Sequence, residues 1–83
     1  MSNRNKDMNS KIIELIKGVI DSKGIKYTYV SNCTDINYQR LMRLFNQNAI
    51  ISGSELICIC KNLPVELDEL MDIVEGFSDK QKN

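Results

Sequence analysis

Apolar residues recur every three or four positions along most of this chain, and this spacing restricts it to a largely helical fold. The clearest stripe lies between residues 12 and 20 and consists of Ile12, Ile13, Leu15, Ile16, Val19 and Ile20. Asn9 or Ser10 is the predicted N-cap of this helix. Lys23 and Gly24 predict its end, because a cation favours the C-terminal dipole and glycine adopts positive φ easily.

Three later segments also carry helix signals. Asn37 is a good N-cap for a short helix with inner residues at i, i+3 and i+4. Ser52 and Glu55 have the spacing of a capping box, and Pro64 separates the helix that follows from a last one, which Gly76 can close. The apolar residues of the three helices are Leu41, Leu44 and Phe45, then Leu56, Ile57, Ile59 and Leu63, then Leu67, Leu70, Met71 and Val74.

Two segments do not follow the helical period. Ile25 to Val30 alternates apolar and polar residues and is rich in β-branched and aromatic ones, so its local propensity favours a strand. Gln47 to Ile51 has no periodicity and predicts a loop.

Composition excludes several classes of protein. The chain has 83 residues, which is enough for one small core, and 42% of them are hydrophobic, which excludes wholesale disorder. Histidine is absent, so histidine-dependent triads and histidine-ligated metal sites are excluded. The three cysteines suit neither a disulfide framework nor a metal knuckle, and we expect reduced, mostly buried thiols. We expect no enzyme activity, no cofactor and no metal.

The chain also lacks membrane and secretion signals. No apolar run approaches the roughly 18 residues that a transmembrane helix needs, and the polar start has no apolar signal core. We therefore expect a cytoplasmic protein. Its charges are balanced overall but unevenly placed: residues 1–47 carry eight basic and four acidic residues, and residues 48–83 carry three basic and seven acidic ones.

The order of these elements resembles the Cro and lambda-repressor type (XRE-like) helix-turn-helix family. The match runs without gaps from about Ile12 to Leu70. Phe45 and Gln47 depart from it, since the family commonly has an acidic residue and a glycine there. The matching positions are Gly24-Ile25, Val30-Ser31, Asp35-Ile36-Asn37, Leu41, Leu44, Leu56, Leu63 and the Leu67-Asp68-Glu69-Leu70 ending.

The resemblance implies an all-α fold, a compact five-helix lambda-repressor-like DNA-binding domain with the helix-turn-helix at its second and third helices. Tyr27 to Cys33 would then be the second helix, with Asp35 in the left-handed region of the turn. We expect a flexible arm over residues 1–9, the helix-turn-helix domain over 10–77 and a polar tail over 78–83.

The resemblance also implies which residues touch DNA. Gln39 can pair with adenine and Arg43 with guanine, while Tyr38 can contact a thymine methyl or a phosphate. Backbone contacts are expected near the start of the second helix and the end of the third. The predicted base contacts are Tyr38, Gln39 and Arg43, and the predicted backbone contacts are Tyr27, Arg40, Asn46 and Asn48. Arg40 can reach either a phosphate or an acidic neighbour.

Two functions are open at this point. The first is a sequence-specific regulator of the phage or mobile-element repressor type, bound to double-stranded DNA as a homodimer on a palindrome. Apolar residues at the C-terminal helix, Val65, Leu67, Met71, Val74 and Phe77, offer a surface for a second copy, although Phe77 can equally fold back on the first helix. The alternative is a protein-interaction module on the same scaffold, an antirepressor-like or antitoxin-like binder, which the zero net charge and the acidic C-terminal helix favour.

Overall fold

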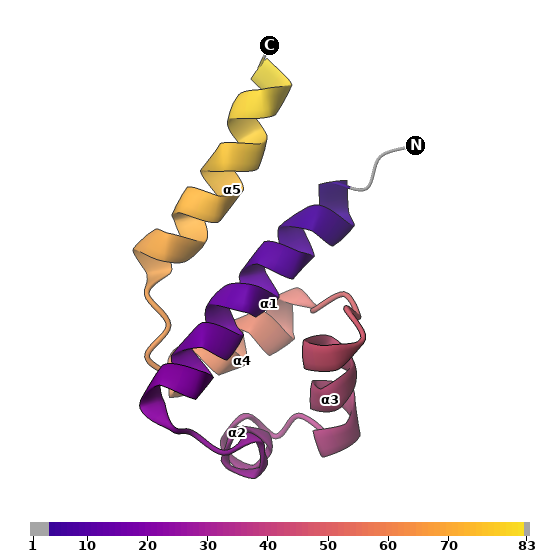
Figure 1. Cartoon of the computed structure of the whole chain (residues 1–83), viewed down its shortest axis with the longest axis vertical. Helices are drawn as coiled ribbons and strands as arrows, with labels where there is room; N and C mark the ends of the chain where they lie inside the picture. The colour runs from indigo at the N-terminus through magenta and orange to yellow at the C-terminus, as the bar shows by residue number, and fades with distance from the viewer. Residues whose placement is uncertain (1–3, 83) are drawn as a thin grey trace.

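The computed structural model describes the backbone of residues 4–82 and the side chains of residues 6–76. This part of the chain forms helices and no strand, which confirms the all-α expectation. The five helices are α1 (Arg4–Lys23), α2 (Tyr27–Thr34), α3 (Tyr38–Asn46), α4 (Gly53–Asn62) and α5 (Leu67–Lys82). Figure 1 shows α2 and α3 at the end of the molecule opposite to the two chain termini, with α5 alongside α1. Within the described range, no helix combines the length and the apolar composition needed to cross a bilayer.

Helix α1 ends where the sequence predicts but begins earlier. Gly24 has a φ of 67°, and the amide of Ile25 bonds the Ile20 carbonyl at 2.9 Å. The start is at Arg4, so residues 4–9 of the expected flexible arm are helical and residues 1–3 lie outside the described range. The expected N-cap at Asn9 or Ser10 is therefore wrong. No proline or glycine interrupts the upstream residues, and the Asn9 side chain bonds a distant loop instead.

The segment with strand propensity is helical from Tyr27 onward. Val30 is fully buried in the core, and the ring of Tyr27 packs against Phe45 with ring centroids 5.3 Å apart. Burial of these two side chains outweighs a β preference of about 1 kcal/mol. Asp35, with a φ of 61°, then turns the chain through the left-handed region, as the resemblance implied.

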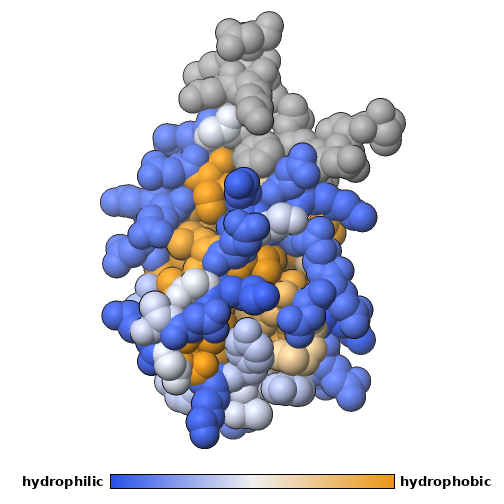
Figure 2. All heavy atoms as spheres, viewed as in Figure 1, coloured by the Kyte–Doolittle hydropathy of each residue, from blue (hydrophilic) through white to orange (hydrophobic). Residues whose placement is uncertain are grey.

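One hydrophobic core joins all five helices. Its buried residues come from all five helices, from the turn before α3 and from the residue that follows α4. They are Ile12, Ile13, Ile16, Ile20, Val30, Ile36, Leu41, Leu44, Phe45, Ile59, Leu63 and Leu70. Figure 2 shows that the face seen in Figure 1 is largely hydrophilic, with apolar side chains visible between the polar ones.

The C-terminal half differs from expectation at two points. Helix α5 does not stop at Gly76 but continues to Lys82, so most of the expected polar tail is helical. Gly76 lies within the helix and does not adopt the positive φ of a helix-ending glycine. The cysteines are less buried than expected: Cys58 is exposed, and Cys33 and Cys60 are half-buried. Ile59 and Leu63 take the inward positions of α4, which leaves Cys58 on the outer side.

Candidate functional site

The outer face of α3 gathers the polar residues that the sequence singled out. Gln39, Arg43 and Asn46 are exposed, and Tyr38 is 43% exposed. The inner face is made of Leu41, Leu44 and Phe45, all buried. Gln39 and Arg43 are four residues apart, so they stand one turn above the other on the solvent side. Of the three predicted base contacts, Gln39 and Arg43 therefore share one exposed helix face, and Tyr38 lies beside it at the first position of the helix.

The turn before α3 fixes how this helix is presented. The side-chain oxygen of Asn37 accepts from the backbone amides of Gln39 at 2.8 Å and Arg40 at 3.3 Å, which confirms Asn37 as the N-cap. The hydroxyl of Ser31 in α2 donates to the carbonyl of the buried Ile36 at 2.6 Å. Helix α2 thus holds the turn before α3 by a side-chain hydrogen bond, and it packs against α3 itself.

Tyr27 lies at the start of α2, beside α3. Its ring is half-buried against Phe45, and burial together with Asp21 and Tyr38 raises the pKa of its phenol above the ordinary value. A tyrosine phenol is protonated at neutral pH at its ordinary pKa of about 10, so the hydroxyl is a hydrogen-bond donor there. A donor at this place suits the phosphate contact that the sequence assigned to Tyr27.

Arg40 forms an ion pair within the protein. Its partner is an acidic neighbour, which is one of the two partners that the sequence left open. Its Nε and Nη2 atoms donate to the two carboxylate oxygens of Glu55 at 2.8 and 2.9 Å, and Nη2 also donates to the Ile50 carbonyl at 2.8 Å. The same carboxylate accepts from the Ser52 amide at 2.9 Å, completing the predicted capping box of α4. Glu55 therefore ties the outward helix α3 to α4. A phosphate contact by Arg40 stays a prediction.

This ion pair predicts a pH-dependent stability. The hydrogen bonds from Arg40 lower the pKa of the Glu55 carboxyl to about 2. An unfolded glutamate titrates near pH 4.3, so the contribution of Glu55 is complete above about pH 4.3 and is lost as the pH falls toward 2. We expect Glu55→Gln to lower the free energy of unfolding at pH 7 by about 1 kcal/mol, because the pair is partly open to solvent. Urea unfolding at pH 7, 4 and 2.5 measures this difference, which should shrink at the lowest pH.

Glu66→Gln is the control, since Glu66 is exposed on the segment before α5. The difference in the free energy of unfolding between Glu66→Gln and the wild type should not change with pH in the way that the difference for Glu55→Gln does. If the Glu55→Gln deficit were the same at pH 2.5 as at pH 7, the ion pair would not be its source.

The loop after α3 is anchored by a residue that the sequence did not single out for this role. Asn9 of α1 is 4% exposed. Its Nδ2 atom donates to the Ala49 carbonyl at 2.9 Å and to Asn48 Oδ1 at 3.3 Å, and its Oδ1 atom accepts from the Ile51 amide at 2.9 Å. These partners lie about forty residues away along the chain, so no local pattern reveals them.

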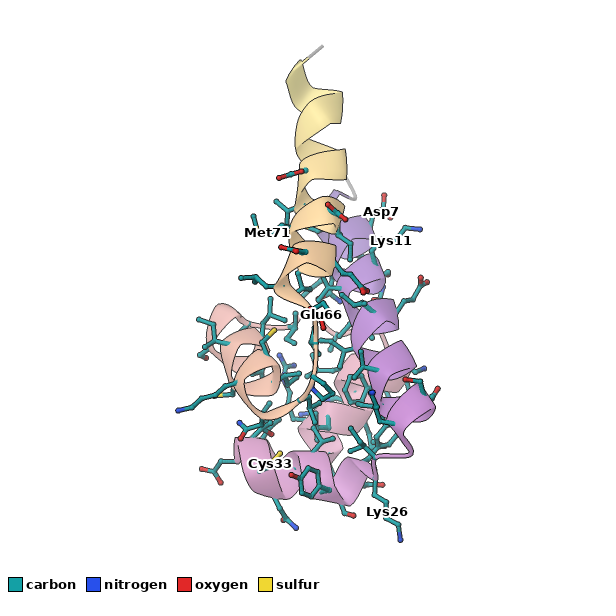
Figure 3. All side chains as sticks on the ribbon, turned by 90° about the vertical axis from the view of Figure 1, so that its left-hand side faces the viewer. Asp7, Lys11, Lys26, Cys33, Glu66 and Met71 are labelled. Carbon is teal, nitrogen blue, oxygen red and sulfur yellow. The ribbon has the colours of Figure 1, made fainter. Side chains whose placement is uncertain are left out.

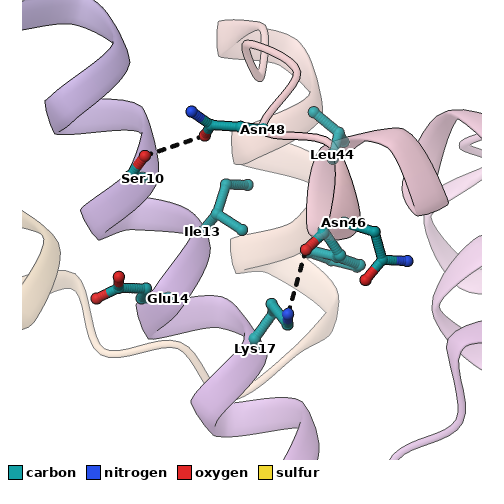
Figure 4. Close-up of a pocket in the computed structure, with 8 residues that line it drawn as sticks. Ser10, Ile13, Glu14, Lys17, Leu44, Asn46 and Asn48 are labelled. Atoms are coloured by element: carbon teal, nitrogen blue, oxygen red, sulfur yellow. Dashed lines mark hydrogen bonds between the residues drawn. The ribbon is translucent and has the colours of Figure 1, made fainter.

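Asn48 and the end of α3 complete this anchor. Asn48 has a φ of 55°, in the left-handed region that asparagine tolerates better than most residues. Its Oδ1 atom also accepts from the Ser10 hydroxyl at 3.0 Å, and Figure 4 shows its nitrogen pointing away from Ser10. Ser10 and Asn48 line a shallow pocket between α1 and the end of α3, where Lys17 of α1 donates to the Phe45 carbonyl at 3.1 Å. The outer amide of Asn48 is thus available beside the end of α3.

We expect Asn9→Ala to destabilise the fold. The change leaves the Ala49 carbonyl and the Ile51 amide without their partner in a partly buried place, and an unsatisfied group of this kind costs about 1–3 kcal/mol. Chemical unfolding measures the loss. Asn62→Ala is the matched control, because Asn62 is exposed and bonds only the Cys58 carbonyl of its own helix. Equal losses in the two variants would contradict the anchoring role of Asn9.

Residues 6–76 contain no group of three or more acidic or cysteine side chains arranged to hold a metal ion. Arg43 on α3 and Lys26, the residue before α2, are both exposed cations. The arrangement offers amide, guanidinium and phenol donors on one face and nothing that resembles a nucleophile with its base. Such a face can recognise hydrogen-bond acceptors and negative charge.

Comparison with known proteins agrees with this geometry. A family model described as a Cro/C1-type HTH DNA-binding domain matches residues 15–76. This stretch contains the whole of α2, α3 and α4 together with the second part of α1 and the first part of α5. No curated protein and no solved structure gives a match.

Proposed function

Since the chain belongs to the Cro/C1-type helix-turn-helix DNA-binding domain family and is therefore a DNA-binding regulator, we propose that it is a sequence-specific repressor of the phage or mobile-element type. In this proposal α3 enters the major groove and α2 lies across the sugar-phosphate backbone. The family is defined by DNA binding and not by a reaction, and we propose no enzymatic activity for this chain.

The observation that carries the proposal is the division of α3 into two faces. Leu41 and Leu44 are fully buried, so they fix the helix on the core. Gln39 and Arg43 are exposed on the opposite side. The Gln39 amide has a donor and an acceptor for the adenine edge, and the Arg43 guanidinium has two donors for the two acceptors of guanine. Gln39 would read adenine and Arg43 guanine, with Tyr38 on a thymine methyl or a phosphate.

Backbone contacts would flank this reading face. Tyr27 offers a protonated hydroxyl at the start of α2, and Asn46 and Asn48 offer side-chain amides at the end of α3. Arg40 is the fourth proposed contact, and it would have to share its guanidinium between Glu55 and a phosphate. Contacts of this kind set the register of the protein on the duplex and carry no sequence information themselves.

The active form would be a homodimer through the C-terminal helix. A single module of this size has too little interface for a tight specific site, so two copies would bind half-sites about 34 Å apart. Leu67 and Met71 are exposed on α5, while Val65 and Val74 are half-buried. The side chain of Phe77, for which two placements were open, lies outside the described residues.

Selection from random DNA duplexes, followed by salt titration, tests the proposal. We expect enrichment of a palindromic sequence and a log affinity that falls linearly with log salt concentration. Absence of enrichment at low salt would refute sequence-specific repression. In that case, recovery of a stoichiometric protein partner in a pull-down would favour the protein-interaction module.

A further inference from the structure

The two cations of α3 differ in their surroundings. Arg43 is exposed, and within residues 6–76 no ion pair involves it. Arg40 is half-buried and pairs with Glu55. The sequence of α3 contains no acidic residue, so the negative charge beside Arg40 is supplied by α4. One of the two positive charges on this helix is therefore neutralised within the fold.

The protein occupies one whole edge of the Arg40 guanidinium. This group has five N–H donors, one on Nε and two each on Nη1 and Nη2. The Nε atom and one N–H of Nη2 face the two oxygens of Glu55 at 2.8 and 2.9 Å, and Nη2 also donates to the Ile50 carbonyl at 2.8 Å. Among the described residues, Nη1 has no hydrogen-bond partner. A phosphate can therefore meet Nη1 alone while the edge formed by Nε and Nη2 stays on Glu55.

Glu55 is itself fixed before any ligand is bound. Its Oε1 atom accepts from the Ser52 amide at 2.9 Å, and its backbone amide donates to the Ser52 hydroxyl at 3.2 Å. The side chains of Glu55 and Arg40 are 19% and 29% exposed. A bidentate pair of this kind is stronger than a contact between two freely moving surface side chains, which lose conformational entropy when they pair. Arg40 is thus restrained on the side of α4.

The position of Arg40 makes this restraint relevant to DNA. Arg40 lies three residues before Arg43 and next to Gln39, and it is half-buried, so it lies at the edge of the exposed face of α3. With α3 in the major groove, an unrestrained arginine at this edge would reach the phosphates that flank the groove. Such a contact carries no sequence information, and each neutralised phosphate adds affinity through counterion release.

We propose that Glu55 is a positioning residue that limits the sequence-independent part of DNA binding. By occupying the Nε and Nη2 edge of Arg40, it competes with phosphates for this guanidinium and keeps the salt dependence of binding shallow. Gln39 and Arg43 are untouched by the restraint, so their contacts with bases are unaffected. The inference rests on the proposed approach of α3 to the major groove, and it adds a residue of α4 that does not itself touch DNA.

Salt titration of the 83-residue chain on a random-sequence duplex at pH 7 tests the restraint. We expect Glu55→Gln to bind more tightly than the wild type at low salt. The slope of log affinity against log salt concentration should be steeper by about 0.9, the value for one further phosphate. Glutamine can preserve the capping box, and circular dichroism checks that the variant is folded. A role in folding alone would lower the affinity with the folded fraction and leave the slope unchanged.

Two further variants separate the restraint from a general effect of charge. Glu66→Gln removes the same charge at an exposed position before α5 and should keep the wild-type slope. Adding Arg40→Gln to Glu55→Gln should abolish the gain, because the released guanidinium is then missing. A Glu55→Gln slope equal to that of Glu66→Gln would overturn the proposal, as would a gain that persists without Arg40.

These outcomes are independent of the selection experiment, because the duplex has a random sequence. A wild type that enriches no palindrome, together with a gain that depends on Arg40, refutes the repressor function alone. A wild type that enriches a palindrome, without any gain in Glu55→Gln, refutes the role of Glu55 alone.

Discussion

Replacing Arg43 by alanine is expected to weaken binding to the selected DNA sequence by about 1–3 kcal/mol and to relax the preference at one base pair. Arg43 is exposed on the outer face of α3, and a guanidinium bonds guanine O6 and N7 together. The loss of a bidentate contact removes discrimination as well as affinity. Binding measured on the selected duplex and on single-base variants of it gives both quantities.

Gln39→Ala should produce a loss of the same size at a different base pair, because Gln39 lies one turn before Arg43 on the same face. Lys11→Ala is the control. Lys11 is an exposed cation of α1 toward the end of the molecule away from α2, as its label in Figure 3 shows relative to that of Lys26. If all three variants lost affinity equally for every sequence, α3 would not be the reading helix.

The parts of the fold that follow local rules were predictable from the sequence. Asn37, with a side-chain oxygen that caps α3, and the Ser52–Glu55 capping box both sit where short-range spacing places them. Asp35 takes the left-handed conformation that the family pattern requires of its position. Helix α2 was predictable only through the resemblance, because its own residues favour a strand and burial of Val30 decides the outcome.

The parts that depend on distant contacts were not predictable. The residues around Asn9 predict that it caps a helix. Its side-chain oxygen instead accepts from the Ile51 amide, 42 positions away along the chain. The partner of Arg40 was left open, because the Glu55 carboxylate that holds it lies in the next helix, 15 positions away. The contacts of Gln39 and Arg43 with bases remain predictions, since the fold places these side chains outward without specifying what they bind.

Leu44→Ala is expected to lower the free energy of unfolding by about 2–5 kcal/mol. Leu44 is fully buried on the inner face of α3, and removing its branched end leaves a cavity that the surrounding helices fill only in part. Small domains are stable by about 5–15 kcal/mol in total, so this single change takes a large share. Urea unfolding measures the loss, and the affinity for DNA should fall with the folded fraction.

Leu44→Met shows whether the loss of stability in Leu44→Ala comes from the cavity or from replacing leucine as such. A change that conserves volume should cost less than about 1.5 kcal/mol. Ile50→Ala, at a residue 47% exposed in the loop after α3, should change stability by no more than about 0.5 kcal/mol.

Excess specific DNA should raise the midpoint of Leu44→Ala unfolding, because a ligand that binds only the folded state stabilises it by mass action. A Leu44→Ala protein as stable as the wild type would mean that α3 is not held by its leucines, and the outward placement of Gln39 and Arg43 would then lose its physical basis.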